Sequence, residues 1–204
     1  MLIRRLPTSE RVVALTFDAC QTLKPAGHSP QIIATLRKER IPATLFLGGR
    51  WMEWHADITK NLAHDPLFEI GTHSYLHPHF PKLTEKQMRA DLEKTLAIHQ
   101  KLTGRKPKTF RPPYGEHNPL TVKVAESYGL TSVLWDVETG DPDPGVSAKE
   151  IVREVFRQTK PGSIIIQHMN GRGWHSPEAL PELIAGLRKR GYRFVYVSAM
   201  NRPV

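Results

Sequence analysis

The sequence is short of cysteine, of long apolar runs and of acidic residues. Its single cysteine, Cys20, excludes an intramolecular disulfide and says little about the compartment. No apolar run approaches the roughly 18 residues of a membrane-spanning helix, and the N-terminal MLIRRLPTSERVVALTF has no signal-peptide pattern. We therefore expect no membrane span. The localisation is left open: secreted or periplasmic if an export signal precedes this stretch, cytoplasmic otherwise.

Basic residues outnumber acidic ones, 29 against 20, and the formal net charge is +9. The Lys and Arg residues are spread over many segments, which is typical of a solvated basic surface. Attraction to an anionic polymer such as cell wall is the functional alternative. No nucleic-acid-binding motif accompanies the charge, so we expect no nucleic-acid partner. No pattern in the sequence predicts the oligomeric state.

The composition, with 39% hydrophobic and 24% charged residues, is that of a globular protein, and we expect a single domain over residues 1–204. Apolar runs rich in β-branched residues predict seven strands. They cover residues 12–17, 43–47, 68–72, 109–110, 131–135, 163–167 and 194–198. Helix signals lie between them, including capping boxes at Thr84 with Gln87 and at Ser147 with Glu150, and a helix is predicted within 51–64.

The alternation of strands and helices predicts an α/β fold with parallel strands, either a β/α barrel or an open doubly wound sheet. In both architectures the chemistry collects at the carboxyl ends of the strands. Ionisable and metal-binding residue types follow the predicted strands at these ends. They are Asp18, His73, His77, Arg111, Asp136, Glu138, Asp141 and His168.

The stretch GTHSYLHPHF, residues 71–80, contains a His-x-x-x-His pair, His73 and His77. Two neutral imidazoles close to one point suit a divalent ion such as zinc, with a carboxylate and water completing the shell. The chain has 10 histidines, so this spacing alone is weak evidence. Its position after a strand, on the same rim as Asp18, favours a metal site. We expect His79 to be an ordinary loop histidine.

Five motifs occur in a fixed order: TFDAC (16–20), HSYLH (73–77), RPPYG (111–115), ETGD (138–141) and IQH (166–168). Together they resemble the motifs of the polysaccharide deacetylases, the family that shares the nodulation-factor deacetylase domain. The resemblance spans nearly the whole chain. It implies a distorted (β/α) barrel with about seven strands and metal-assisted removal of acetyl groups from N-acetylated glycans, chitin-like or peptidoglycan-like.

The resemblance also implies roles for individual residues. Asp18 matches the general base, His168 the general acid that protonates the leaving amine, and Asp141 the carboxylate that tunes this acid. Arg111 matches the arginine that holds the base. An amide needs an activated water, a stabilised oxyanion and a proton for its nitrogen, which these groups could supply.

Further residues match the family's metal and substrate sites. His73 and His77 match the metal-binding histidines, and the backbone N–H of Tyr114 matches the oxyanion donor. Pro113 and Tyr114 belong to the motif that lines the substrate. Trp174 is the tryptophan most suited to stack on a sugar, because glycines before it indicate an exposed loop.

The sequence departs from the family at the metal site. The family usually has a second aspartate as a metal ligand where this chain has Ala19. Three accounts compete: Asp18 binds the metal itself, water fills the place, or Cys20 serves as a thiolate. We favour Asp18, because the cation would otherwise have only neutral imidazoles, and we expect Cys20 to be a small packing residue. The expected metal is zinc, with cobalt and nickel as alternatives.

Other departures concern the substrate wall. Glu138 stands where the family often has aspartate, and Pro142 where a tryptophan commonly lines the groove. Together with Gln21, these changes leave two further hypotheses. One is a hydrolase of a small non-sugar amide or imide. The other is a glycan-binding module that has lost catalysis with the missing aspartate.

Overall fold

The computed structural model describes residues 1–21 and 26–201, and the described chain forms two compact units. The first comprises Met1–Ile3, Ala19–Ala26 and Leu45–Leu134, and the second comprises Arg4–Asp18, Gly27–Thr44 and Trp135–Val204. The single domain expected over residues 1–204 stays a prediction. Within the described residues, no helix is both long enough and apolar enough to cross a membrane.

The first unit is built on parallel strands. Its strands, in their spatial order, are β1 (Leu2–Ile3), β6 (Thr131–Val133), β5 (Thr109–Phe110), β4 (Phe68–Thr72) and the greater part of β3 (Ala43–Leu47). Thr72 pairs with Phe110, and Phe110 pairs with Ser132. The carboxyl ends of these strands therefore lie at one edge, from which the loops that follow β4 and β5 emerge.

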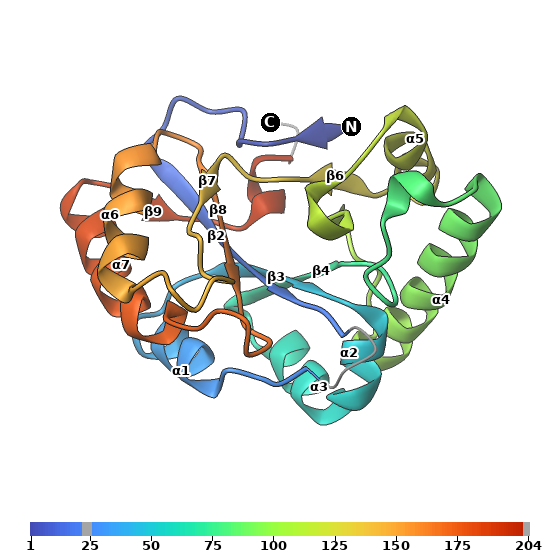
Figure 1. Cartoon of the computed structure of the whole chain (residues 1–204), viewed down its shortest axis with the longest axis horizontal. Helices are drawn as coiled ribbons and strands as arrows, with labels where there is room; N and C mark the ends of the chain where they lie inside the picture. Colours follow the sequence, from blue (N-terminus) through green and yellow to red (C-terminus); the bar gives the residue numbers. More distant parts are fainter. Residues whose placement is uncertain (22–25, 202–204) are drawn as a thin grey trace. The chain divides into compact units, whose positions relative to one another are not determined.

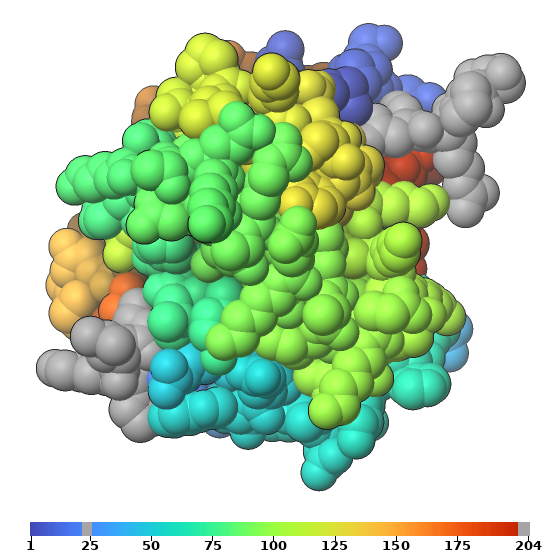
Figure 2. Space-filling view, turned by 90° about the vertical axis from the view of Figure 1, so that its right-hand side faces the viewer, coloured from blue at the N-terminus to red at the C-terminus, as the bar shows by residue number. Residues whose placement is uncertain are grey.

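The described part of this unit also contains α-helices (Figure 1). They are α2 (Gly49–Trp54), α3 (Ala56–His64), α4 (Glu85–Thr103) and α5 (Pro119–Ser127). The long helix α4 packs against the other three. It begins at the predicted capping box of Thr84 and Gln87 and ends at Gly104, whose φ of +70° suits a residue without Cβ. The side chains of α4 spread over the middle of the face seen in Figure 2.

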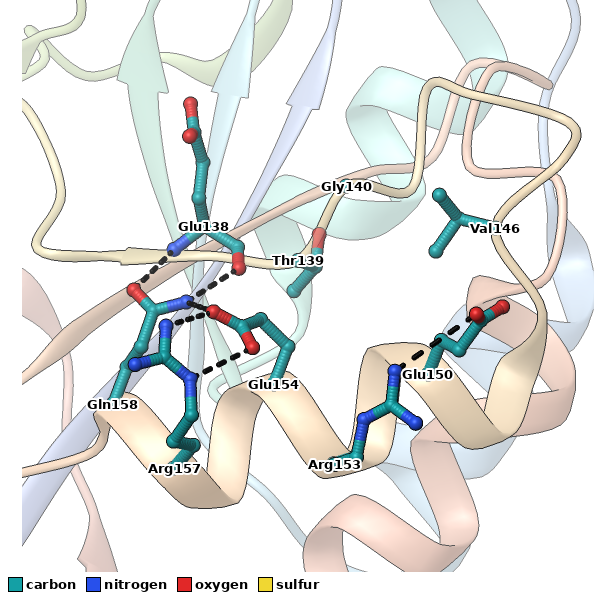
Figure 3. A pocket seen from close by; sticks show the side chains of 9 residues that line it. All are labelled: Glu138, Thr139, Gly140, Val146, Glu150, Arg153, Glu154, Arg157 and Gln158. Atoms are coloured by element: carbon teal, nitrogen blue, oxygen red, sulfur yellow. Dashed lines mark hydrogen bonds and ion pairs between the residues drawn. The ribbon is translucent and has the colours of Figure 1, made fainter.

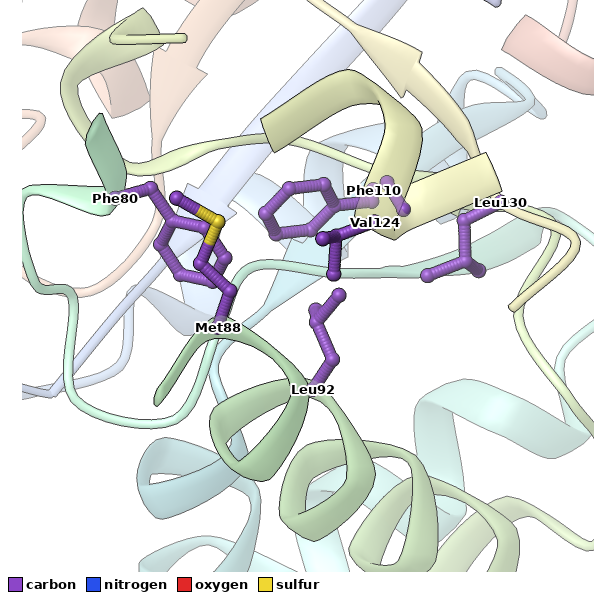
Figure 4. Close-up of a cluster of buried hydrophobic side chains, with 7 residues drawn as sticks. Phe80, Met88, Leu92, Phe110, Val124 and Leu130 are labelled. Carbon is purple, nitrogen blue, oxygen red and sulfur yellow. The ribbon is translucent and has the colours of Figure 1, made fainter. Parts of the chain in front are cut away.

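The inner side of α4 closes a hydrophobic cluster (Figure 4). Met88 and Leu92 extend from the helix toward Phe110 of β5. The other buried members are Phe80, Val124, Ala125 and Leu130. The cluster attaches α4 and α5 to β5, and so supports the strand from which residues 111–115 continue.

The strands of the second unit are also parallel. β2 (Val12–Ala19, apart from its last residue) pairs with β8 (Ile164–His168), β8 pairs with β7 (Val137–Glu138), and the start of β2 pairs with β9 (Arg193–Phe194). Its helices are α1 (Pro30–Lys38), α6 (Ala148–Gln158) and α7 (Ser176–Lys189), with α7 packed against both others (Figure 1). The capping box at Ser147 and Glu150 is present as predicted.

Nine strands occur in the described ranges, against seven predicted. The two strands that were missed, β1 and β7, have two residues each. The strand predicted over 194–198 is wrong beyond Phe194, since a 3-10 helix spans Val197–Asn201. There, the N–H of Val197 donates to the side-chain hydroxyl of Thr44 in β3 and not to a backbone carbonyl.

The helix predicted within 51–64 is two helices. His55 separates α2 from α3 with φ −117° and ψ 44°, which no helical residue adopts. Its ring packs 4.6 Å from that of Trp51, and its Nε2 donates to the carbonyl of Ala26 at 3.0 Å. This long-range hydrogen bond explains a break that local propensity does not predict.

Candidate active site

The first unit brings together three side chains that can bind a metal. His73 follows directly after β4, and Cys20 follows directly after β2. One ligand atom each from Cys20, His73 and His77 lies within 4.8 Å of the other two. The imidazole rings meet edge to face with centroids 4.8 Å apart. Imidazole nitrogen and thiolate sulfur are donors that zinc, cobalt and nickel accept, so these residues fit such an ion.

The orientation of His73 is set by the loop after β5. Its Nδ1 donates to the backbone carbonyl of Arg111 at 2.7 Å, which leaves Nε2 as the atom with a lone pair. The Arg111 side chain is fully buried. Its guanidinium donates to two carbonyls at the end of β6, at 3.3 and 3.2 Å, and lies 4.1 Å from the centroid of the Phe46 ring. Arg111 thus orients a histidine through its backbone.

Backbone hydrogen bonds from the turn after β3 hold the two sides of the cluster together. The N–H of Gly48 donates to the carbonyl of Ala19, and the N–H of Gly49 donates to that of Ser74, both at 2.8 Å. A Cβ on Gly49 would lie 2.8 Å from the Tyr75 ring, so a larger residue there would force the ring to move. This turn fixes Cys20 beside the histidine loop.

Helix α4 holds the loop between His73 and His77 through the side chain of Asp91. The carboxylate of Asp91 accepts the N–H of Tyr75, at 3.0 Å to one oxygen and 3.2 Å to the other. Burial raises the pKa of Asp91 to about 6, although backbone hydrogen bonds from Tyr75 and Leu76 and the charge of Lys94 lower it. No motif indicated Asp91, because its partner in this contact is 16 residues away.

Backbone strain gathers in this part of the first unit. Among the described residues, four non-glycine residues have positive φ, and three of them are Ser74 (63°), His77 (57°) and Tyr114 (60°). Each such conformation costs free energy and persists only where the surroundings impose it. Strain concentrated around two candidate metal ligands and a motif tyrosine is an independent sign of a functional site.

Tyr114 lies over the histidines. Its ring is stacked on His79 with centroids 4.4 Å apart and an angle of 12°, and meets His77 edge-on at 4.3 Å. The Nδ1 of His79 donates to the carboxylate of Glu116 at 2.8 Å. Tyr114 is 50% exposed, whereas Pro113 is buried. His79, expected to be an ordinary loop histidine, therefore supports the motif tyrosine, a contact that only the fold shows.

The second unit places the other predicted residues together. Asp18 and His168 are register partners at the carboxyl ends of β2 and β8, so their side chains leave the same face of neighbouring strands. The Nδ1 of His168 donates to the carboxylate of Asp141 at 2.9 Å. Asp18 and Asp141 are almost completely buried. The predicted base, acid and tuning carboxylate are thus adjacent.

Asp141 is held by more donors than the sequence indicated. Its carboxylate accepts the backbone N–H of His168 at 2.7 Å, the hydroxyl of Ser176 at 2.7 Å and the hydroxyl of Thr139 at 3.1 Å. A Cβ on Gly173 would lie 2.3 Å from the His168 carbonyl, so only glycine fits. Trp174, 57% exposed, follows in the loop as predicted. The donors at His168 and Ser176 lie at the end of β8 and the start of α7, and no single sequence motif contains both of them with Asp141.

A cavity of about 530 Å³ lies beside this group in the second unit, between the chain at residues 138–146 and the charged side of α6 (Figure 3). The carboxylate of Glu138 points away from α6 and accepts the indole N–H of Trp135 at 3.3 Å. Its backbone is held by the side-chain amide of Gln158. The replacement of the family's aspartate by Glu138 therefore affects a surface contact, the one with Trp135.

Comparisons with known proteins show which family the chain resembles. A family model described as Polysaccharide deacetylase matches residues 5–133. The peptidoglycan-N-acetylglucosamine deacetylase of Bacillus cereus is 37% identical over 196 residues, covering 95% of this chain and 70% of that protein. A crystal structure of a peptidoglycan N-acetylglucosamine deacetylase in complex with 4-naphthalen-1-yl-N-oxidanyl-benzamide has a TM-score of 0.89 at 35% identity, covering 98% and 92% of the two chains.

A third relative is of another kind. The crystal structure of a CE4 family pseudoenzyme from Bacillus anthracis also has a TM-score of 0.89, at 28% identity, and the match covers 99% of this chain and 71% of that one. Likeness in fold therefore extends to a protein described as a pseudoenzyme. Catalysis therefore has to be inferred from the residues of the site and not from the fold.

The fold and the comparisons define the class of protein, a β/α-barrel hydrolase of carbon–nitrogen bonds other than peptide bonds. The chain belongs to the polysaccharide deacetylase family, which includes deacetylases that cleave amide bonds of glycans. The resemblance and the fold class predicted from the sequence are thereby confirmed. The individual roles of the site residues stay predictions.

Proposed function

We propose that the protein is a metal-dependent N-deacetylase of an N-acetylated glycan, peptidoglycan-like or chitin-like. The observation that carries this proposal is the cluster of donor atoms at Cys20, His73 and His77 in a chain of the deacetylase family. The 37% identity to a peptidoglycan-N-acetylglucosamine deacetylase supports the choice of glycan. A bound divalent ion supplies Lewis acidity, which polarises an amide carbonyl and makes water acidic near neutral pH.

The residues of the chain take the remaining roles. Asp18 is the general base, and we also keep it as a candidate metal ligand because position 19 is an alanine. His168 donates a proton to the leaving nitrogen, while the buried Asp141 holds its Nδ1–H and so presents Nε2 to the substrate. Arg111 positions His73 through its carbonyl and, as the resemblance implies, holds the base.

Substrate binding involves the exposed aromatic side chains. Tyr114 is proposed to offer its backbone N–H to the oxyanion, at a position where the strained φ of 60° is maintained by the fold. Trp174 is proposed to stack on a sugar ring, in line with its exposure. Pro113 supports Tyr114 from a buried position.

The test is release of acetate from N-acetylglucosamine oligomers and from peptidoglycan, with zinc, cobalt or nickel supplied. We expect a chelator and the substitution His73→Ala each to abolish release. The exposed His64 on α3 provides a matched control, and His64→Ala should keep full activity. The proposal is rejected if no glycan releases acetate although metal is supplied.

A small non-sugar amide or imide is a second candidate substrate, since Gln21 and Pro142 differ from the family. A screen of small amides and cyclic imides under the same conditions would reveal it. Preference for a small amide over every glycan would replace the proposed substrate and leave the chemistry unchanged.

A glycan-binding module without catalysis is favoured by one observation, the close structural likeness to a CE4 family pseudoenzyme. This alternative predicts that oligosaccharide binding is unchanged by Asp18→Asn. It also predicts no turnover with any of the three metals. The retained set of Asp18, Asp141 and His168 argues for the enzyme, because binding alone needs no such group of acids and bases.

A further inference from the structure

Cys20 occupies a place that packing alone does not explain. It is the only cysteine of the chain. It is 4% exposed, and its sulfur lies within 4.8 Å of ligand nitrogens of both His73 and His77. Cysteine is most often a small apolar filler when buried, but an apolar filler would be expected against apolar side chains rather than two imidazoles.

The backbone around Cys20 is built to keep it there. Gly48, from the turn after β3, donates its N–H to the carbonyl of Ala19, and its neighbour Gly49 donates to the carbonyl of Ser74. A Cβ on Gly48 would lie 3.4 Å from the Cα of Cys20. The segment carrying the thiol and the loop carrying the imidazoles are therefore attached to the same turn. Such preorganisation is typical of a ligand set.

The chemistry at position 19 requires a substitute donor. Ala19 is fully buried, and its methyl group offers no ligand atom. A divalent cation held by two neutral imidazoles keeps its full charge in a buried place, which is costly. A thiolate supplies one negative charge and is among the donors that zinc prefers. A bound metal in turn deprotonates the thiol.

The distances agree with such a site. In a tetrahedral shell with zinc–sulfur bonds of about 2.3 Å and zinc–nitrogen bonds of about 2.1 Å, neighbouring donors are about 3.4 to 3.6 Å apart. The ligand atoms here are separated by at most 4.8 Å. Metal binding therefore requires the donor atoms to move closer together than this upper limit. The hydrogen bond from His73 Nδ1 to the Arg111 carbonyl already selects the tautomer that can bind.

We propose that the thiolate of Cys20 is the third protein ligand of a divalent metal bound by His73 and His77, in place of a carboxylate at position 19. This inference rests on the metal site of the proposed function. It releases Asp18 from binding the metal, so that Asp18 can serve as the base. It also predicts a preference for zinc and cobalt over harder ions such as magnesium.

The first experiment reads the ligand directly. Cobalt(II) is added to the metal-free full chain, and the near-ultraviolet thiolate-to-cobalt charge-transfer band is recorded. Because the chain has one cysteine, the band can come only from Cys20. We expect the band in the wild type, its loss in Cys20→Ser and Cys20→Ala, and its retention in His64→Ala.

The second experiment measures zinc affinity by competition with a chelator. Loss of an outer-shell partner lowers metal affinity about 10 to 100-fold, so loss of a ligand should lower it by about 100-fold or more. We expect this loss of zinc affinity for Cys20→Ala. Thermal unfolding of the metal-free variants checks that they fold. The double substitution Ala19→Asp with Cys20→Ala should recover affinity without recovering the band.

The outcomes separate this inference from the proposed function. Cobalt binding without the band, together with unchanged zinc affinity in Cys20→Ala, overturns the role of Cys20. If His73→Ala still abolishes binding in that case, and acetate is still released, the proposed function stands. A band that is lost with Cys20 supports the inference even if no glycan is deacetylated.

Discussion

Asp91 gives the protein a pH dependence that can be worked out from the structure. This carboxyl group on α4 accepts the N–H of Tyr75, in the loop between the two candidate metal-binding histidines. Burial raises its pKa from 3.8 to about 6. The difference of about 2 pKa units corresponds to about 3 kcal/mol of free energy of unfolding, at about 1.4 kcal/mol per unit.

The sign follows from proton binding. Between about pH 4 and about pH 6 the folded state holds this proton and the unfolded state releases it, so protons favour folding. The contribution of Asp91 to stability therefore rises as the pH falls from about 6 to about 4. His99 on the same helix acts in the opposite direction, because burial lowers its pKa and protonation favours the unfolded state. The wild-type curve alone mixes the two effects.

The substitution Asp91→Asn isolates the carboxyl group. Urea unfolding at a series of pH values gives the free energy of unfolding of the wild type and of the variant. As the pH falls from about 6 to about 4, we expect the free energy of unfolding of the wild type to rise by about 3 kcal/mol relative to that of the variant. Asp57→Asn on α3 is the control, since Asp57 is 99% exposed, and it should follow the wild type. A constant difference between wild type and Asp91→Asn would refute the buried, proton-binding state of Asp91.

Three further predictions concern packing and catalysis. Leu92→Ala removes a fully buried side chain from the hydrophobic cluster that packs against α4, and should lower the free energy of unfolding in urea by about 3 kcal/mol. Lys101→Ala, at an exposed position of the same helix, should change this free energy little. Gly173→Ala brings a Cβ to 2.3 Å from the His168 carbonyl and should lower acetate release about 100-fold, whereas Gly27→Ala, with its nearest atom at 3.7 Å, should not. His168→Ala should lower kcat about 100-fold or more with little change in KM, because a general acid acts in the transition state.

Results that would contradict these expectations are equally definite. Unchanged stability in Leu92→Ala would mean that the cluster in Figure 4 is not packed as described. Full activity in Gly173→Ala would mean that the support of Asp141 does not matter for the reaction. A variant His168→Ala that loses substrate affinity but keeps kcat would assign His168 to binding.

Local signals explain how much of the fold could be predicted. The capping boxes at Thr84 and Ser147 act within four residues, and both helices begin where they indicate. Strands β3, β4 and β5 have the predicted bounds, because runs of β-branched and aromatic residues act locally too. The break at His55 could not be predicted, since it depends on a hydrogen bond to Ala26, 29 residues away.

The sequence by itself determined the order of strands and helices, and placed His73, His77, Asp18, Arg111 and His168 at or just after the carboxyl ends of strands. Within each unit, parallel strands bring such residues to one edge by topology alone. Only the tertiary structure decided what surrounds them: the thiol of Cys20 beside the imidazoles, Asp91 under the loop, and four donors around Asp141. These contacts join segments distant in the chain, so they depend on how the elements pack and leave no local trace in the sequence.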